Sequence, residues 1–554
     1  MWLRIKDIKL LAEKIYIAKD NTPEEHEKAL LTNKMSKVLH IPTERVRQVE
    51  IYRKSPDLRK NTEPCFIYTV DAEISGRVKQ NKEISIITKK QDLYNEYIES
   101  FLQNLKIAQK RPVIVGFGPA GIFCALVITE LGFKPIVIER GGKVEERTKS
   151  VENFWQKGQL NTESNIQFGE GGAGTFSDGK LNSLIRDKDT VGRFVLETFV
   201  RFGAPKEILY KNKPHIGTDI LRDVIKNIRQ YIIGKGAEVY FNTKMTELIT
   251  NRSKLLGVKV VSADKNKTPE SKIIETDSAF LAIGHSARDT FEQLKAQKII
   301  MEKKAFSVGV RIEHLQEDID KAQYSKSAEL MRKLNGAADY KLSHRASNGR
   351  GVYTFCMCPG GFVVGAASEN GRLVTNGMSN FDRAGKNANS ALLVSVTPND
   401  FSESDVLAGV EFQRRLEEKA FHLGGETWKA PCQLAGDFIK GKISVQTGKV
   451  EPTFSNGYKL ADLNEILPKD VAVALKEGIP AFGKLIKGFD DYDAVLTGCE
   501  TRSSSPVRIL RDETGNSVSL KGLFPVGEGA GYAGGILSAA ADGVKVVEKW
   551  LNNL

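Results

Sequence analysis

The chain has few cysteines and no long hydrophobic run. Its six cysteines lack the regular spacing of a disulfide framework, which argues against a disulfide-stapled secreted protein. They are Cys65, Cys124, Cys356, Cys358, Cys432 and Cys499. No apolar stretch approaches the ~20 residues that span a membrane, and Met1 to Asp7 interleave charged with apolar residues, unlike a signal peptide. We therefore expect a cytoplasmic protein with no membrane partner.

Compositional bias is also missing. With 41% hydrophobic and 27% charged residues the chain can bury a large interior, which excludes collagenous, fibrous and disordered classes. A length of 554 residues is too great for one core, so two or three domains are expected. The formal net charge of +12 is a moderate excess in a long chain, which favours a solvated surface over a nucleic-acid partner.

Residues 1–105 predict a small N-terminal α/β domain. The run Thr22 to Glu25 fits a capping box with proline at the first helical position, and the helix it opens is expected to reach about Leu39. Apolar and polar residues alternate from Phe66 to Ile74, which indicates a half-buried strand. Residues 1–111 hold 22 Lys and Arg against 16 Asp and Glu, half of the chain's excess. An interaction module is thus an alternative to a solvated surface.

A βαβ pattern, with short elements separated by clear turn signals, begins at Pro112. The apolar strand Val113–Val115 runs into Gly116-Phe117-Gly118-Pro119-Ala120-Gly121, a helix follows to about Leu131, and a second strand ends at Glu139. The glycines permit a tight turn, close backbone approach to a pyrophosphate, and packing of helix on strand. The helix N-terminus favours phosphate, and Glu139 is placed to accept ribose hydroxyls. The order of these elements predicts an adenine-dinucleotide site, and Glu139 disfavours NADP because it would repel a 2′-phosphate.

Two later elements favour FAD over NAD. In the segment 523–531 a strand delivers Glu528 into a glycine-rich turn, and a helix begins near Ile536. Such an acid can accept a ribitol hydroxyl while the helix dipole adds to the pyrophosphate site. The apolar strand 278–284 ends in a small-residue turn at Gly284, where backbone can pass close to the cofactor. An NAD domain needs no such element some 400 residues after its fingerprint.

Three long motifs carry a family resemblance: residues 169–181, residues 354–361 and the run from Gly522 to Gly543. They resemble the bacterial FAD-dependent dehydrogenase-like family from about residue 110 to the C-terminus and, less distinctly, in the N-terminal unit. The resemblance implies FAD and an α/β fold with a Rossmann-type, glutathione-reductase-like FAD-binding domain. It implies little about substrate.

The expected layout places an inserted domain within the FAD-binding fold. The FAD-binding domain takes residues 106–300 and 496–554, and an inserted mixed α+β domain on the substrate side takes residues 301–495. Within the insertion we expect a strand over Gly361 to Ala366 and a helix over Asp405 to His422.

The cofactor contacts follow from the resemblance and from the neighbouring motif residues. They are Gly116, Gly118, Pro119, Ala120, Gly121, Glu139, Arg140, Gly174, Thr175, Lys180, Met245, Ala282, Gly284, Gly527, Glu528 and Ile536. Met245 is expected to offer its backbone to the adenine. The spacing from Gly174 to Lys180 is also close to that of a nucleotide triphosphatase loop, but Leu181 stands where such a loop needs Ser or Thr for magnesium. We therefore interpret this run as a loop along the flavin.

The candidate catalytic residues are Cys356, Cys358 and Arg502. The two thiols can act as a redox relay or nucleophile beside the flavin, or pack as small hydrophobes, and their spacing makes a mutual disulfide strained and a metal site disfavoured. Arg502 can stabilise a reduced, anionic flavin, or can pair at a domain junction. The sequence thus predicts an FAD-dependent oxidoreductase for a small molecule, with substrate, electron donor and oligomeric state open. An FAD-dependent RNA-modifying protein and a flavin-bound scaffold without turnover are the alternatives.

Overall fold

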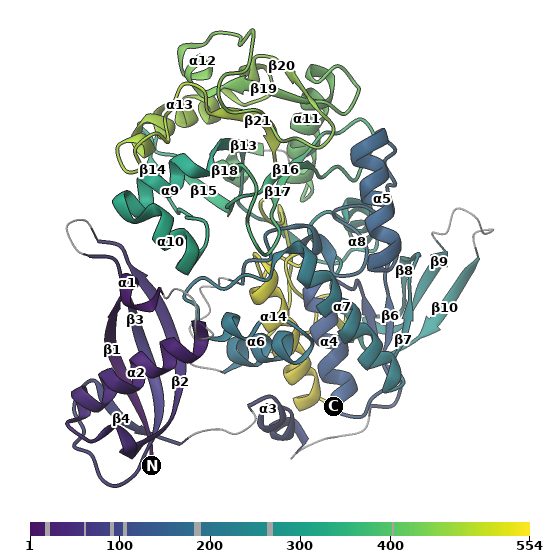
Figure 1. The fold of residues 1–554 in the computed structure, drawn as a ribbon. Coiled ribbons are helices and arrows are strands. Elements are labelled where there is room, and N and C mark those ends of the chain that lie inside the picture. The colour runs from purple at the N-terminus through teal and green to yellow at the C-terminus, as the bar shows by residue number, and fades with distance from the viewer. Residues whose placement is uncertain are drawn as a thin grey trace.

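The structure is a computed structural model that describes residues 1–16, 23–59, 63–88, 93–102, 108–181, 190–262, 270–401 and 404–554. Figure 1 shows three parts, a small sheet at the N-terminus, a central part that holds the C-terminus, and an inserted part. No helix among the described residues is long and apolar enough to cross a membrane.

The N-terminal part is a four-stranded antiparallel sheet in the order β2-β3-β1-β4, crossed on one face by α2 (Figure 1). Its elements are β1 Trp2–Leu11, α1 Ala12–Ile15, α2 Pro23–Leu39, β2 Val46–Asp57, β3 Cys65–Ile74 and β4 Ile84–Ile87. The alternation predicted for β3 is confirmed, because Tyr68 and Val70 are buried in one core with Leu31 and Met35 of α2. The helix range is confirmed too, whereas its expected cap Thr22 lies outside the described residues.

This small sheet is joined to the central part through backbone hydrogen bonds. The Lys54 N–H of the edge strand β2 donates to the Tyr210 carbonyl at 2.8 Å, and the Asn212 N–H donates to the Lys54 carbonyl at 3.0 Å. Helix α3 (Leu93–Leu102) lies inside the predicted N-terminal domain, yet it packs on α6 (Val191–Arg201) of the central part, where the Tyr94 and Phe194 rings stack 5.2 Å apart.

The central part is built on a five-stranded parallel sheet in the order β23-β11-β5-β6-β7. Its strands are β5 Val113–Val115, β6 Ile136–Ile138, β7 Glu238–Tyr240, β11 Ala279–Leu281 and β23 Leu523–Pro525. Such an order, with the first strand central and the chain reversing beside it, is that of a Rossmann-type dinucleotide fold. An antiparallel sheet of β8 (Thr243–Asn251), β9 (Lys254–Ser262) and β10 (Ser271–Glu275) lies beside it.

Two helices distant in sequence pack together on this sheet. Helix α4 (Pro119–Glu130) follows β5, and α14 (Ile536–Asn552) follows β23 at the C-terminus (Figure 1). They meet through small residues: a side chain at Gly543 would meet the Ala120 carbonyl oxygen at 2.5 Å. The N-termini of both helices therefore reach the same edge of the sheet. The other helices of this part are α5 Val144–Lys157, α7 Gly217–Gly234 and α8 Arg288–Ala296.

The inserted part is a seven-stranded sheet in the order β14-β15-β18-β13-β21-β19-β20 with a separate hairpin, β16-β17. Its strands are β13 Phe306–Leu315, β14 Ser343–Arg345, β15 Gly351–Cys358, β16 Phe362–Gly365, β17 Thr375–Met378, β18 Asn387–Val396, β19 Ala430–Leu434, β20 Tyr458–Leu460 and β21 Val495–Glu500. Its helices are α9 Gln316–Tyr324, α10 Ala328–Asn335, α11 Ala408–Leu423, α12 Ala435–Lys440 and α13 Lys469–Gly483. The expected strand and helix of this region are thus present as β16 and α11. The mixed α/β architecture is as predicted.

Candidate functional site

A cavity of about 230 Å³ lies between the central sheet and the inserted part. Most of the predicted site residues line it. They are Gly116, Gly118, Pro119, Ala120, Glu139, Arg140, Gly174, Lys180, Met245, Ala282, Gly284, Cys356, Cys358, Arg502, Glu528 and Ile536. Residues that are more than 400 positions apart in the chain are therefore brought to one pocket.

The glycine turn after β5 forms the floor of this pocket. Gly116 has φ of 98°, and a Cβ there would lie 2.3 Å from the Ala282 carbonyl oxygen at the end of β11, so the turn requires glycine. Gly118 is different, because a Cβ there would meet only the backbone of Gly172, at 3.6 Å from Cα and 3.9 Å from N, which is ordinary van der Waals contact. The protein itself would tolerate that Cβ, which would instead fill space at the pocket wall.

Two helix N-termini converge beside this turn. Gly118 caps α4, Gly535 caps α14, and both line the pocket. The first N–H groups of a helix have no intrahelical acceptor and carry a partial positive charge, so the pair forms an anion site suited to a pyrophosphate.

Glu139 closes the end of the pocket that follows β6. It is 5% exposed, and its carboxylate accepts the backbone N–H groups of Phe117 at 2.8 Å and of Gly141 and Gly169 at 2.9 Å. A carboxylate has about four acceptor positions, so one remains for a ribose hydroxyl. The same side chain thus orders the glycine turn and faces the ligand space.

Arg140, Lys244 and Met245 line the same end. The Arg140 guanidinium lies 4.1 Å above the Phe168 ring. It donates to Glu163 at 2.7 Å and to Asp289 at 2.8 Å. Lys244 pairs with the same two acids. The cations are therefore held by protein carboxylates, and this end offers a ring face and backbone, as an adenine requires.

Three predicted contacts, Gly121, Thr175 and Gly527, are not among the residues that line the cavity, and their contact with the cofactor stays a prediction. Gly121 packs α4 on the turn, since a Cβ would lie 1.9 Å from the Gly116 carbonyl oxygen. Gly527 makes a similar approach to Ala120. Thr175 is buried and its hydroxyl donates to the Glu170 carbonyl at 3.1 Å.

The opposite end of the pocket lies against the inserted part. Lys180 donates through Nζ to the Met357 carbonyl oxygen of β15, and it stands 4.0 Å from Asp178. The segment before Lys180 is the 3-10 turn Gly172–Phe176 and not a strand, which agrees with a loop along the flavin. Because a dinucleotide would extend across the glycine turn from its ribose acid, the flavin ring of a bound FAD would lie at this end.

A bulge in β15 separates the two thiols. Residues i and i+2 of a regular strand share a face, but the register shifts between Phe355 and Cys358, and Cys356 has φ of 42°. Cys356 is exposed on the pocket wall, whereas Cys358 is buried and donates to the Cys356 carbonyl at 3.3 Å. Desolvation by the surrounding pocket wall raises the pKa of Cys356 to about 12 and that of Cys358 to about 11, although the Cys356 side chain itself is exposed to the pocket. Both shifts favour the neutral thiol at neutral pH.

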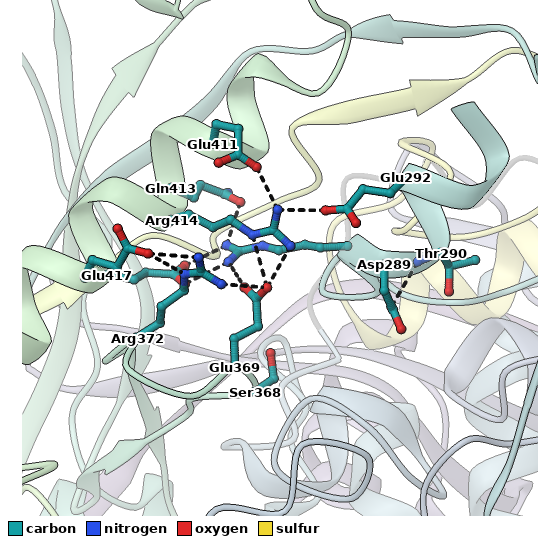
Figure 2. A network of polar contacts seen from close by, with 12 residues as sticks. Asp289, Thr290, Glu292, Ser368, Glu369, Arg372, Glu411, Gln413, Arg414 and Glu417 are labelled. Atoms are coloured by element: carbon teal, nitrogen blue, oxygen red, sulfur yellow. Dashed lines mark hydrogen bonds and ion pairs between the residues drawn. The ribbon is translucent and has the colours of Figure 1, made fainter. Parts of the chain in front are cut away.

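Arg502 lines the pocket wall and belongs to a buried network of ion pairs. Its Nε and Nη2 donate to Glu417 of α11 at 3.2 and 3.0 Å, and Nη1 donates to Ser368 at 2.5 Å. Glu417 also binds Arg288 of α8 at 2.7 Å. Burial works to raise the pKa of Glu417, but the two arginines outweigh it and hold that pKa well below its ordinary range. Figure 2 shows the network continuing through Glu369.

The turn after β23 holds Glu528 at the pocket wall. Its Oε1 lies 3.2 Å from Nδ1 of His285, which follows the Gly284 turn of β11. A Cβ at Gly529 would lie 2.4 Å from the Gly284 carbonyl oxygen, so the two turns are in direct contact. The late acid and the small-residue turn predicted from the sequence are therefore parts of one wall.

The donor set fits FAD. One buried carboxylate faces the ribose position, a cradle free of side chains and two helix N-termini face the pyrophosphate, and a second acid stands where a ribitol chain would pass. The residues that would hold FAD are thus Glu139, the turn at Gly116 to Gly118, and Glu528.

The chain's family agrees with this site. Residues 305–503 match the family described as FAD-dependent protein, C-terminal domain-like, and residues 5–73 match a domain of unknown function. An uncharacterized protein from Clostridium beijerinckii is 48% identical over 522 residues, covering 94% of this chain and 95% of that protein. The chain belongs to the same family as that protein, a family of FAD-dependent proteins, and FAD is its cofactor.

Solved structures show more distant similarity. A geranylgeranyl bacteriochlorophyll reductase-like protein from Thermoplasma acidophilum is 12% identical, with a TM-score of 0.35 over 80% of this chain and 78% of that one. A glycerol-3-phosphate dehydrogenase from Bacillus halodurans, complexed with FAD, is 12% identical, with a TM-score of 0.33 over 82% of this chain and 67% of that one.

The sequence did not reveal Asn376 and Lys244 as pocket residues. Asn376 lies on β17, where no glycine motif marks it, and only the pairing of β16 with β17 brings it to the pocket. Lys244 directly precedes Met245, so the prediction of Met245 as an adenine contact could also have predicted Lys244 as a pocket residue.

Replacement of Glu139 by alanine is expected to weaken FAD affinity by about 10- to 100-fold, because a charge-assisted bond to a ribose hydroxyl is lost and the glycine turn loses its acceptor. Fluorescence titration of apoprotein with FAD measures this change. The neighbouring variant Glu146→Gln, an exposed residue of α5, is the control. Equal FAD affinity in wild type and Glu139→Ala would contradict the assigned geometry.

Proposed function

We propose that the protein is an FAD-dependent oxidoreductase of glutathione-reductase-like fold, which passes electrons or hydride between its flavin and a small molecule bound against the inserted part. The observation that carries this proposal is the composition of the far end of the pocket. There Lys180 donates to the Met357 carbonyl of the inserted part, and Cys356 and Asn376 of the same part line the pocket, which supports a substrate bound against that part.

Bound FAD would supply the redox chemistry, and the chain's own residues would orient it and exclude water. The Lys180 ammonium and the Arg502 guanidinium supply positive charge at the end where charge accumulates on reduction. The buried network around Glu417 fixes Arg502 in place. These groups are positioned before any ligand arrives, which is the condition for electrostatic stabilisation.

Reoxidation kinetics test the proposal. Photoreduced holoprotein is mixed anaerobically with candidate acceptors (quinones, disulfides, enoates, ferric complexes and nicotinamide dinucleotides), and flavin absorbance is followed. At least one class should reoxidise the flavin faster than oxygen does and at a rate that saturates with acceptor concentration. Rates that are slow and linear with every class would favour a flavin-bound scaffold without turnover.

Both thiols line the pocket, but Cys356 is the exposed one of the two. We expect alkylation of apoprotein to modify Cys356 slowly at neutral pH, because its pKa is raised to about 12, and to leave the buried Cys358 unmodified. FAD loading should protect Cys356. Peptide mapping after alkylation checks both statements. Flavin reduction and reoxidation in Cys356→Ser, with Cys358→Ser as its matched control, then separates chemistry from packing: unchanged kinetics in both variants would leave catalysis to the flavin alone.

A further inference from the structure

We propose that the flavin end of the pocket recognises a carboxylate group on the substrate through Lys180, Arg502 and Asn376. The inference rests on the proposed function only where it calls the bound molecule a substrate. The carboxylate-binding site itself does not depend on that function. It follows from an accounting of hydrogen-bond donors and of charge at this end of the cavity.

The donors at this end are only partly used within the described part of the chain. Arg502 has five N–H groups, and three of them donate hydrogen bonds to Glu417 and Ser368. One of the three N–H groups of Lys180 donates to the Met357 carbonyl oxygen. Asn376 accepts through Oδ1 from the Gly377 N–H at 2.8 Å, and no acceptor for its Nδ2 is found among the described residues. All three side chains line the cavity.

The acids at the same end are already neutralised. Glu500 receives a bidentate pair from Arg311, with both distances 2.7 Å. Asp178 accepts from Arg383 at 3.0 Å and from the Ser379 hydroxyl. Each carboxylate thus has its own arginine, and the Lys180 ammonium, 4.0 Å from Asp178, adds a second cation beside a carboxylate that is already paired.

Arg502 is held in a buried network that balances its charge. Arg502 and Arg288 share the fully buried Glu417, and Glu369 lies 2.5 Å from Arg288 and 4.0 Å from Arg502. The network therefore fixes the Arg502 guanidinium at the pocket wall and leaves its remaining N–H groups as donors. A cavity lined by the Lys180 ammonium and by such N–H groups favours an anion.

The shape of the donor set selects a carboxylate among small anions. Arg502 retains one N–H on each terminal nitrogen of its planar guanidinium, although Nη2 also lies 4.0 Å from Glu369, and such N–H groups suit carboxylate oxygens. Lys180 acts as a point charge from the loop on the other side. The backbone N–H groups that typically cradle a phosphate lie instead at the helix N-termini, where the pyrophosphate of a bound cofactor would lie.

Ligand titration of oxidised holoprotein tests this inference without turnover. Sodium acetate is added at constant ionic strength, with chloride as the balancing salt, and the visible spectrum of the flavin is recorded. A saturable shift is expected in the wild type. In Lys180→Met and Arg502→Lys the acetate Kd should rise at least ~10-fold, because one charge-assisted contact or the planar fork is lost. Lys213→Met, an exposed lysine outside the pocket, should leave the Kd unchanged.

Three results would overturn the inference: no saturable shift in the wild type, unchanged Kd in both pocket variants, or tighter binding of inorganic phosphate than of acetate. If acetate does not bind but Lys180→Met lowers the flavin's reduction potential, the cations serve the flavin ring and not a substrate. Acetate binding by a holoprotein whose flavin no acceptor reoxidises would contradict the proposed oxidoreductase alone, so the two failures are distinguishable.

Discussion

Gly118→Ala should lower FAD affinity by about 100-fold or more while leaving the apoprotein as stable as the wild type. Gly118 has φ of −79° and ψ of −174°, a conformation open to alanine, and its added Cβ would touch only the Gly172 backbone, at 3.6 Å from Cα and 3.9 Å from N. The protein therefore gains no strain. The methyl group instead occupies the pocket wall where backbone must approach the pyrophosphate.

Two measurements separate this effect from misfolding. Thermal unfolding of the apoprotein reports stability, and fluorescence titration with FAD reports affinity. Gly234→Ala is the matched control, because it lies at the end of α7 with no atom within 4 Å of the new Cβ. FAD affinity equal to that of the wild type in Gly118→Ala would place the pyrophosphate elsewhere.

Glu417→Ala should destabilise the folded protein by about 3–5 kcal/mol, the cost of leaving buried charges without their partner. Glu417 is fully buried, and its loss removes a shared carboxylate from Arg502 and from Arg288, which is 2% exposed and would keep only Glu369 as an acidic partner. The network joins α8 of the central part to α11 of the inserted part, so urea unfolding should begin at this junction. Loss of the Arg502 anchor should also loosen FAD.

The matched control is Glu411→Gln on the same helix. Glu411 is half-exposed and pairs with Arg414 at the rim of the network, a kind of contact worth about 0–1 kcal/mol (Figure 2). Equal unfolding midpoints for the two variants would contradict the role given to Glu417.

Lowering the pH should reduce the stability of the folded protein through Glu417. Because the folded-state pKa of Glu417 is held below its ordinary value of about 4.3, its contribution is complete above that pH and is lost as pH falls toward the folded-state pKa. The stability difference between the wild type and Glu417→Ala should therefore shrink below about pH 4.

Local sequence determines the cofactor half of the site. The β5 strand, the turn at Gly116 and the acid at Glu139 are consecutive, so each constrains its neighbour and the motif is readable. The strand ends at Gly284 and Glu528 were also readable, because a parallel sheet brings the carboxyl ends of its strands together.

The half of the site that lies against the inserted part depends on pairings between distant segments. The contact of Lys180 with the Met357 carbonyl spans 177 positions, and that of Arg502 with Glu417 spans 85. No periodicity encodes such partners. The bulge that exposes Cys356 and buries Cys358 is likewise set by pairing of β15 with β18, which the thiol spacing does not reveal.

The central claim is that one FAD occupies the pocket between the central sheet and the inserted part. Its most direct test is identification of the chromophore released when purified protein is denatured, with the amount compared to protein concentration. The account predicts a yellow protein that releases FAD, close to one molecule per chain, and apoprotein that takes up FAD again. A colourless protein that fails to take up FAD, or release of FMN in its place, would contradict it.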